Sequence, residues 1–217
     1  MKLTRALPLL AVTLTATLAL TGCFGSVVAD STAAPTSSPS ATASESDSPS
    51  APTDGSLAEP GTEASIGENL TYEFFNTDGG SALISATLKS IEPVSAEQLA
   101  FLNEQFAQLK GYDVYFLLVE ETKISGADVK FNASYTGYKP IDANGTQVQG
   151  ITLIGWDECS NESFPTEFDT PGTPLVNCFM AAAVPGGNQP EGIMYTGGFE
   201  DENPYSDYDG KPLYWFK

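Results

Sequence analysis

The sequence predicts a mainly β protein, an antiparallel β-sandwich with one short helix. Short runs in which apolar and polar residues alternate are separated by turns rich in Gly, Pro, Asn and Asp. About seven to nine such strands fit within roughly 150 residues, a spacing that favours a sandwich over a parallel α/β fold. Convincing helical spacing occurs in a single segment, which agrees with this class.

The first strands are predicted from alternation and from continuous apolar character. Residues 81–91 (SALISATLKSI) have one face more apolar than the other, as in a half-buried strand. Residues 113–122 (DVYFLLVEET) contain a run that is apolar on both faces, which indicates a central, covered strand. Residues 129–135 alternate again, and we expect an antiparallel strand with one wet face there.

One short inserted helix is predicted at about residues 96–110. Ser95 and Gln98 fit a capping box at its N-terminus. Three leucines and Phe106 follow at helical spacing, and Gly111 provides a C-terminal stop. We expect this helix to lie across one end or edge of the sheet.

The later strands are separated by turn sequences. The turns are DANG (142–145), DTPG (169–172), PGGN (185–188) and YDGK (208–211). The strands expected between and around them lie at residues 146–155, 173–184, 192–196 and 213–216.

The N-terminus has the pattern of an export signal. Lys2 and Arg5 precede an apolar stretch, residues 6–20, that is shorter than the roughly 20 apolar residues needed to cross a bilayer. The sequence Leu20-Thr21-Gly22-Cys23 then resembles the lipobox of bacterial lipoproteins. This resemblance implies cleavage before Cys23, acylation of Cys23 and anchoring on the extracytoplasmic face of the cell membrane. The alternative is an ordinary cleaved signal peptide in which Cys23 is incidental.

The chain is expected to have three parts: a signal peptide at 1–22, a stalk at 23–62 and a folded domain at 63–217. After the lipidated Cys23, the stalk is dominated by Ser, Ala, Thr and Pro. Such a segment has too little apolar surface to offset the entropy of ordering its backbone. We therefore expect a disordered linker ahead of one globular domain.

The folded region resembles a group of bacterial domains. The resembling parts are the lipobox and stalk, the strand at 112–119 (YDVYFLLV) and a downstream pair of cysteines with a Pro-Gly turn between them. They are similar to the uncharacterised immunoglobulin-like domains of Gram-positive, actinobacterial-type lipoproteins, whose fold is similar to that of the secreted immunoprotective extracellular antigens. The resemblance spans most of residues 66–217. It implies an immunoglobulin-like sandwich and supplies no catalytic residues.

Two cysteines, Cys159 and Cys178, remain if Cys23 carries lipid. An even pair in an exported protein predicts a disulfide. Closing a loop of this size would stabilise the fold by roughly 3 kcal/mol. The alternative is a thiol site for metal or redox chemistry, but the sequence has no C-x-x-C and no histidine.

The charge balance excludes several classes of function. The chain has 28 acidic residues, nine Lys and Arg, and no histidine, for a net charge of −19. It therefore has no basic footprint for nucleic acid. The absence of histidine from the sequence excludes Ser–His and Cys–His catalysis and His-metal sites.

An acidic, loop-prone cluster near the C-terminus is the candidate metal site. Asp201, Asp207 and Asp209 are the candidate ligands for calcium, which prefers carboxylate and carbonyl oxygens on turns. The match to a calcium loop is incomplete, because no third oxygen ligand precedes Gly210 and no Glu follows at the required distance. The alternative is a solvated acidic loop, and we expect no other cofactor.

Paired carboxylates could still support glycoside hydrolysis. Glu120 and Glu121 are adjacent on a predicted strand, so their side chains point to opposite faces and make a poor acid–base pair. Asp157 and Glu158 lie beside Trp156, on which a sugar could stack. The alternative interpretation of Trp156 is an aromatic that packs in the core or on the disulfide.

Aromatic residues are concentrated in the last quarter of the chain. Tyr195, Tyr205 and Tyr208 are the candidates for an exposed recognition surface rimmed by acidic residues. Packing in the core is the alternative.

The sequence thus predicts a lipid-anchored extracytoplasmic protein that displays a non-catalytic immunoglobulin-like domain. We expect the domain to bind or scaffold an envelope or secreted protein partner, with the lipid anchor as its contact with the membrane. The alternative is a binding protein for calcium or a small polar ligand, and the third interpretation is a carboxylate-based cell-wall glycosidase. A concave pocket with convergent polar groups would favour ligand binding.

Overall fold

The computed structural model describes residues 56–153, 156–197 and 203–217. The chain divides into two units, Met1–Ser44 and Glu45–Lys217, and all the described residues belong to the second. Cys23, the predicted signal peptide and most of the predicted stalk lie outside the described residues. Where the structure describes the chain, no helix combines the length and the apolar character needed to cross a membrane.

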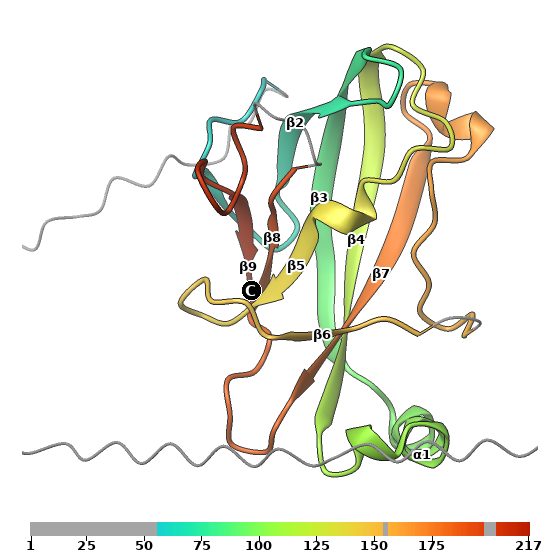
Figure 1. The fold of residues 1–217 in the computed structure, drawn as a ribbon, viewed down its shortest axis with the longest axis vertical. Helices are drawn as coiled ribbons and strands as arrows, with labels where there is room; N and C mark the ends of the chain where they lie inside the picture. The colour runs from blue at the N-terminus through green and yellow to red at the C-terminus, as the bar shows by residue number, and fades with distance from the viewer. Residues whose placement is uncertain (1–55, 154–155, 198–202) are drawn as a thin grey trace, which may run out of the picture. The chain divides into compact units, whose positions relative to one another are not determined.

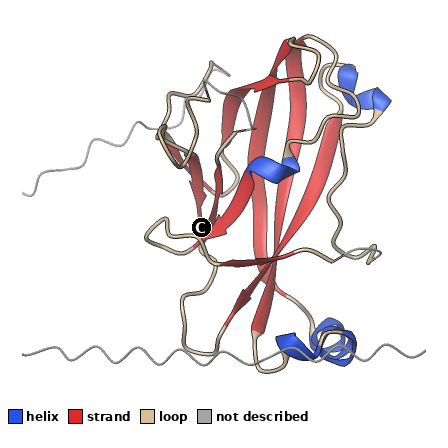
Figure 2. Ribbon diagram, in the orientation of Figure 1, coloured by secondary structure: helices blue, strands red, loops and turns tan. Residues whose placement is uncertain are grey.

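The described residues form two β-sheets and one α-helix (Figure 1, Figure 2). The four-stranded sheet has the order β1 (Glu63–Ser65), β9 (Leu213–Phe216), β8 (Gly192–Tyr195), β5 (Tyr138–Ile141). The five-stranded sheet has the order β2 (Asn69–Phe75), β3 (Ser81–Pro93), β4 (Asp113–Gly126), β7 (Pro174–Ala183), β6 (Gln149–Ile151). The helix α1 (Ala96–Gln105) connects β3 to β4.

The strand order is that of an immunoglobulin-like sandwich. In the five-stranded sheet β4 pairs with β7, whereas in the second sheet β8 pairs with β5 on one side and with β9 on the other. In immunoglobulin domains strands B and E likewise lie in one sheet, and strands C, F and G lie in the other. The predicted fold class is confirmed. One pairing of named strands, β1 with β9, is parallel, and the other pairings of named strands within the described residues are antiparallel.

Three long strands, β3, β4 and β7, lie side by side in the five-stranded sheet (Figure 1). Alternate side chains on β4 and β7 belong to two separate apolar clusters, as expected where a sheet is covered on both faces, whereas the apolar side chains of β3 belong to the main core alone. Leu117 and Phe179 belong to the main core, which includes residues of the second sheet. Their chain neighbours Phe116 and Met180 belong to the second cluster, which also contains residues of α1.

The helix begins as predicted and ends earlier. Ser95 Oγ accepts a hydrogen bond from the Gln98 backbone N–H, and Gln98 Oε1 accepts one from the Ser95 N–H, so the capping box is present. The α-helix ends at Gln105, and a 3₁₀ helix, η1 (Ala107–Leu109), completes the predicted segment. Gly111 follows with a φ of 84°, a left-handed conformation that suits glycine at the stop.

Residues 129–135 do not form the predicted strand. Phe131 is exposed and has a φ of 67°, which interrupts an extended backbone. The Phe131 N–H donates to the Phe164 carbonyl, and the Phe164 N–H donates to the Asn132 carbonyl. The segment therefore crosses from the sheet of β4 to the sheet of β5, and pairing with that sheet starts at Tyr138.

Packed residues occur before residue 63, the predicted start of the domain. Ala58 is buried, and its N–H donates to the Thr71 carbonyl over 2.7 Å. Tyr205 Oη donates to the Ala58 carbonyl over 3.1 Å. Residues just ahead of β1 thus belong to the folded domain.

A lysine on the inner side of β4 forms a buried ion pair with the 3₁₀ helix η3 (Thr166–Asp169). Lys123 Nζ lies 3.1 Å from Asp169 Oδ1, and their side chains are 3% and 13% exposed. Asp169 Oδ1 also accepts the Val129 N–H over 2.7 Å. Burial alone would raise the pKa of Asp169, but the hydrogen bonds from Val129 and Lys123 outweigh it and hold this pKa below its ordinary value.

We expect Asp169→Asn to lower the free energy of unfolding by about 3 kcal/mol, because it leaves the buried Lys123 ammonium with only the exposed carboxylate of Asp128, 4.0 Å away, as a counter-charge. Urea denaturation at neutral pH measures the loss. The exposed pair Lys89–Glu120, at 3.2 Å, supplies the matched control, and Lys89→Gln should cost less than about 1 kcal/mol. Equal losses in the two variants would contradict the special role of the buried pair.

Candidate functional site

A cleft lies at the open side of the sandwich, between β5 of one sheet and β7 of the other. β6 pairs with β7 only from Met180 to Ala182. The preceding part of β7 is bordered by residues 156–161 instead of a strand. We call this feature the edge cleft. Its volume of about 610 Å³ is in the range of roughly 300 to 1,000 Å³ found for small-molecule sites.

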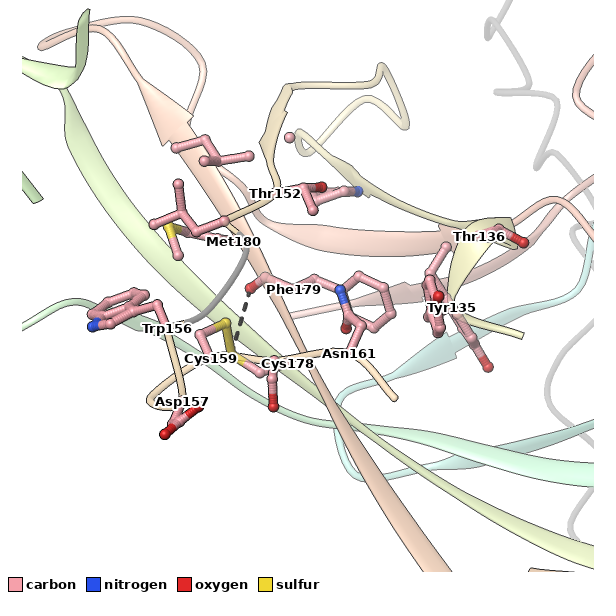
Figure 3. A pocket seen from close by; sticks show the side chains of 16 residues that line it. Tyr135, Thr136, Thr152, Trp156, Asp157, Cys159, Asn161, Cys178, Phe179 and Met180 are labelled. Carbon is pink, nitrogen blue, oxygen red and sulfur yellow. Dashed lines mark hydrogen bonds between the residues drawn. A yellow bond between two sulfur atoms is a disulfide. The ribbon is translucent and has the colours of Figure 1, made fainter. Parts of the chain in front are cut away.

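The edge cleft has both apolar and polar walls, with the apolar share slightly the larger. The apolar and aromatic lining includes Tyr135, Tyr138, Leu153, Trp156, Phe179 and Met180. The polar side chains are Thr136, Thr152, Asp157, Ser160 and Asn161. Figure 3 shows Trp156 and Asp157 at one end of the cleft, Tyr135 and Thr136 at the other, and Phe179 between them.

The predicted disulfide forms one wall of the cleft. Cys159 and Cys178 are bonded, which confirms their pairing. On either side of the bond, the Cys178 N–H donates to the Ser160 carbonyl over 3.0 Å and the Glu162 N–H donates to Asn177 Oδ1 over 2.8 Å. A covalent bond and two hydrogen bonds therefore hold the loop against β7.

Trp156 packs in the apolar cluster around the disulfide, in agreement with the alternative interpretation of this residue as a packing aromatic, and it also lines the cleft. Its ring lies 6.0 Å from that of Phe101 and 5.6 Å from that of Phe116, in the apolar cluster that contains the disulfide. Glu158 turns to the helix, where its Oε2 accepts a hydrogen bond from Gln98 Nε2 over 2.6 Å. Among the described residues that line the cleft, Asp157 is the single carboxylate.

A polar cluster centred on Glu121 lies inside the core, behind the cleft. Glu121 Oε1 accepts hydrogen bonds from the hydroxyls of Tyr72 and Tyr138, the second over 3.0 Å. Glu121 Oε2 accepts from Ser134 Oγ over 2.7 Å and from Asn177 Nδ2 over 3.2 Å. All five residues are buried or nearly so, and they come from both sheets and from the segment that joins β4 to β5.

Burial controls the protonation of this cluster. Desolvation raises the pKa of Glu121, and the hydrogen bonds from its four donors offset only part of that effect. Burial first, and then the neighbouring Glu121 carboxyl, raise the pKa of Tyr72 and Tyr138 well above 10.0. Both phenols therefore stay protonated at neutral pH, where they donate to Glu121.

Tyr138 belongs to both sites. Its ring lines the edge cleft and lies 5.3 Å from the ring of Phe179, while its hydroxyl donates to Glu121. Alternation along the strand places Glu121 on the apolar face with Leu117 and Val119, and a charged residue on such a face was the one sequence signal for the cluster. No comparable local pattern marks the cleft.

Two of the three tyrosines predicted to form a recognition surface are buried, so that prediction is wrong for them. Tyr195 is 1% exposed because β8 lies in the middle of its sheet, and its ring lies 4.0 Å from that of Tyr72. Tyr205 is 3% exposed and its hydroxyl is bonded to the Ala58 carbonyl. Tyr208, at 97% exposed, is the one that can meet a partner directly.

The candidate calcium ligands are not brought together by the described residues. Asp201 lies outside them, and Asp207 Oδ2 is 2.6 Å from Lys139 Nζ in an ion pair. Asp209 is exposed on the turn before Gly210. Within the described ranges, no group of three or more acidic or Cys side chains is placed to hold a metal ion.

The fold and the cleft define an immunoglobulin-like domain with a ligand-sized site at its open edge. The crystal structure of MPT63, a secreted protein from Mycobacterium tuberculosis, is similar to this chain. The sequence identity is 16% and the TM-score 0.42, over 71% of this chain and 96% of MPT63. No protein-family model matches the chain, and no curated protein matches it.

We expect Glu121→Gln to remove a pH dependence from the stability. The pKa of Glu121 in the folded state is raised above its ordinary value of 4.5, so protonation favours the folded state. This contribution is complete below the ordinary pKa and is lost as the pH rises through the folded-state pKa. The free energy of unfolding of the native protein, relative to Glu121→Gln, should therefore fall as the pH rises, as measured by urea denaturation from acid to neutral pH.

Glu120→Gln provides the control for this experiment, because it removes a carboxylate on the opposite face of the same strand. In that variant the free energy of unfolding should depend on pH as it does in the native protein. Glu121→Leu leaves four donors without an acceptor, and we expect it to lower the free energy of unfolding by about 3 kcal/mol or more. If the native protein instead gains stability relative to Glu121→Gln as the pH rises, the hydrogen bonds outweigh burial. That result would contradict a raised pKa of Glu121.

Proposed function

We propose that this protein is a lipid-anchored, extracytoplasmic binding protein whose immunoglobulin-like domain is non-catalytic and takes its ligand in the edge cleft. The lipobox-like sequence ending at Cys23 and the predicted stalk support anchoring and display away from the membrane. The disulfide supports an exported protein, because such bonds persist in oxidising compartments.

The edge cleft is the observation that carries the binding role. Small-molecule sites are concave and combine apolar surface with placed polar groups. The cleft combines the two kinds of surface, with the apolar share slightly the larger. Its walls are held by the disulfide on one side and by the bond from Tyr138 to Glu121 on the other. A site held open in this way loses little conformational entropy when a ligand enters.

The carboxyl groups support a non-catalytic role. Glycoside hydrolysis needs two carboxyls about 5 to 10 Å apart across the scissile bond. Asp157 has no acidic partner among the described residues that line the cleft. Glu121 is enclosed by its four donors and does not line the cleft, so a substrate there could not reach it.

We expect the native protein to fractionate with membranes and Cys23→Ala to be released from them, because an acyl chain on that sulfur is the proposed anchor. Mass spectrometry of the N-terminal peptide checks the modification directly. An unmodified N-terminal peptide in the native protein would contradict lipid anchoring without affecting the binding role.

A photo-reactive amino acid in place of Thr152, an exposed position of the cleft, should cross-link to whatever occupies the cleft in living cells. The same amino acid in place of Thr77, in the exposed turn between β2 and β3, is the matched control. We expect a defined adduct at residue 152 that is missing at residue 77, detected by mass spectrometry. Equal labelling at the two positions would contradict binding in the cleft.

A further inference from the structure

We infer that the edge cleft selects an uncharged amphipathic small molecule, with an apolar body and one neutral hydrogen-bonding group such as a hydroxyl or an amide. This inference rests on the proposed binding function and specifies the class of ligand. It follows from three properties of the wall: its apolar area, its neutral polar groups and the distribution of charge.

The apolar part of the wall suits an aromatic or aliphatic body. Met180 and Trp156 line the cleft from the face of β7 that carries the disulfide (Figure 3). Leu153 and the disulfide extend this surface. Phe179 points to the opposite face of β7 and lines the cleft beside Tyr138. Covering such a surface with an apolar group removes it from water, which is the main favourable contribution to binding in sites of this kind.

The polar part of the wall suits a neutral head group. Ser160 and Thr152 present hydroxyls, which donate or accept as needed. Asn161 is half-buried, and its Oδ1 is buried without a hydrogen-bond partner. An amide carries one acceptor and two N–H donors and no charge, so Asn161 adds a neutral polar group to this wall.

The charges around the cleft exclude an anionic ligand. Among the described residues that line it, none is Lys or Arg, and the one charged side chain is the carboxylate of Asp157. Lys139, on β5 between Tyr138 and Pro140, is paired with Asp207 at 2.6 Å and does not line the cleft. A phosphate, carboxylate or sulfonate would thus be desolvated without a partner and repelled by Asp157.

Two dyes that share one aromatic skeleton test this inference. N-phenyl-1-naphthylamine is neutral and has a single N–H donor, whereas 8-anilino-1-naphthalenesulfonate adds a sulfonate to the same rings. The protein is the oxidised chain from residue 24 onward, so that neither lipid nor detergent competes for the dye. We expect the neutral dye to bind at least about tenfold more tightly than the sulfonate in fluorescence titrations, since the sulfonate must be desolvated unpaired.

Two variants locate the binding and its charge selectivity. Thr152→Trp fills the cleft entrance and should weaken binding of the neutral dye by about tenfold or more. Thr77→Trp should leave the affinity for this dye unchanged. Asp157→Lys changes an exposed side chain of the cleft wall, and it should strengthen binding of the sulfonate relative to the neutral dye by about tenfold. Thermal melts confirm that each variant is folded.

The outcomes separate this inference from the proposed function. Tighter binding of the sulfonate, lost in Thr152→Trp, would show a cleft that binds anions, which overturns the inference and leaves the binding function in place. Dye binding that is insensitive to Thr152→Trp overturns the inference, and the cross-linking at residue 152 then decides the binding function by itself. Preference for the neutral dye that depends on Thr152 and shrinks by about tenfold in Asp157→Lys supports it.

Discussion

The buried carboxyl group of Glu121 constrains how the two sheets meet. Its four donors belong to β2, β5, β7 and the segment that precedes β5, so both sheets converge on two oxygen atoms. A polar group in a core is tolerated while its hydrogen bonds are complete, and it becomes costly when they are not. Because a slip of one residue would turn a donor to the opposite face of its strand, the cluster specifies the register of the sandwich.

The same constraint shapes the edge cleft. β5 is an edge strand, held in its sheet by β8, and Tyr138 fixes it to the opposite sheet through Glu121. On the facing wall, the bond between Cys159 and Cys178 ties the loop to β7. The cleft is therefore bounded by one polar tie through the core and one covalent tie at the surface. The binding surface is therefore already formed in the folded domain, before a ligand enters. It lies where β6 is too short to extend the sheet.

Local sequence patterns were sufficient where a residue interacts with near neighbours. The capping box at Ser95, the turn at 142–145 and the alternation in the long strands are of this kind. They failed where the role of a residue depends on distant partners. Residues 129–135 alternate, yet the chain must cross between sheets there; Tyr195 and Tyr205 lie among acidic loops in sequence, yet they pack in the core. The partners of Glu121 lie 13 to 56 residues away, so its face could be predicted and its cluster could not.

Charge selectivity in the cleft is a local property, although the whole chain is acidic. The net charge of the chain is −19, and most carboxylates of the described residues are exposed. At physiological salt these charges are screened over about 8 Å, so most of them act weakly within the cleft. What remains is the wall itself, with Asp157 at an exposed position and no basic residue among the described lining. An uncharged ligand is not repelled by Asp157 and does not need a basic partner. Its affinity depends on apolar contact and on neutral hydrogen bonds near Ser160 and Asn161. The choice of ligand therefore resides in a few residues of β7 and its disulfide loop, and the acidity of the remaining surface is free to serve solubility.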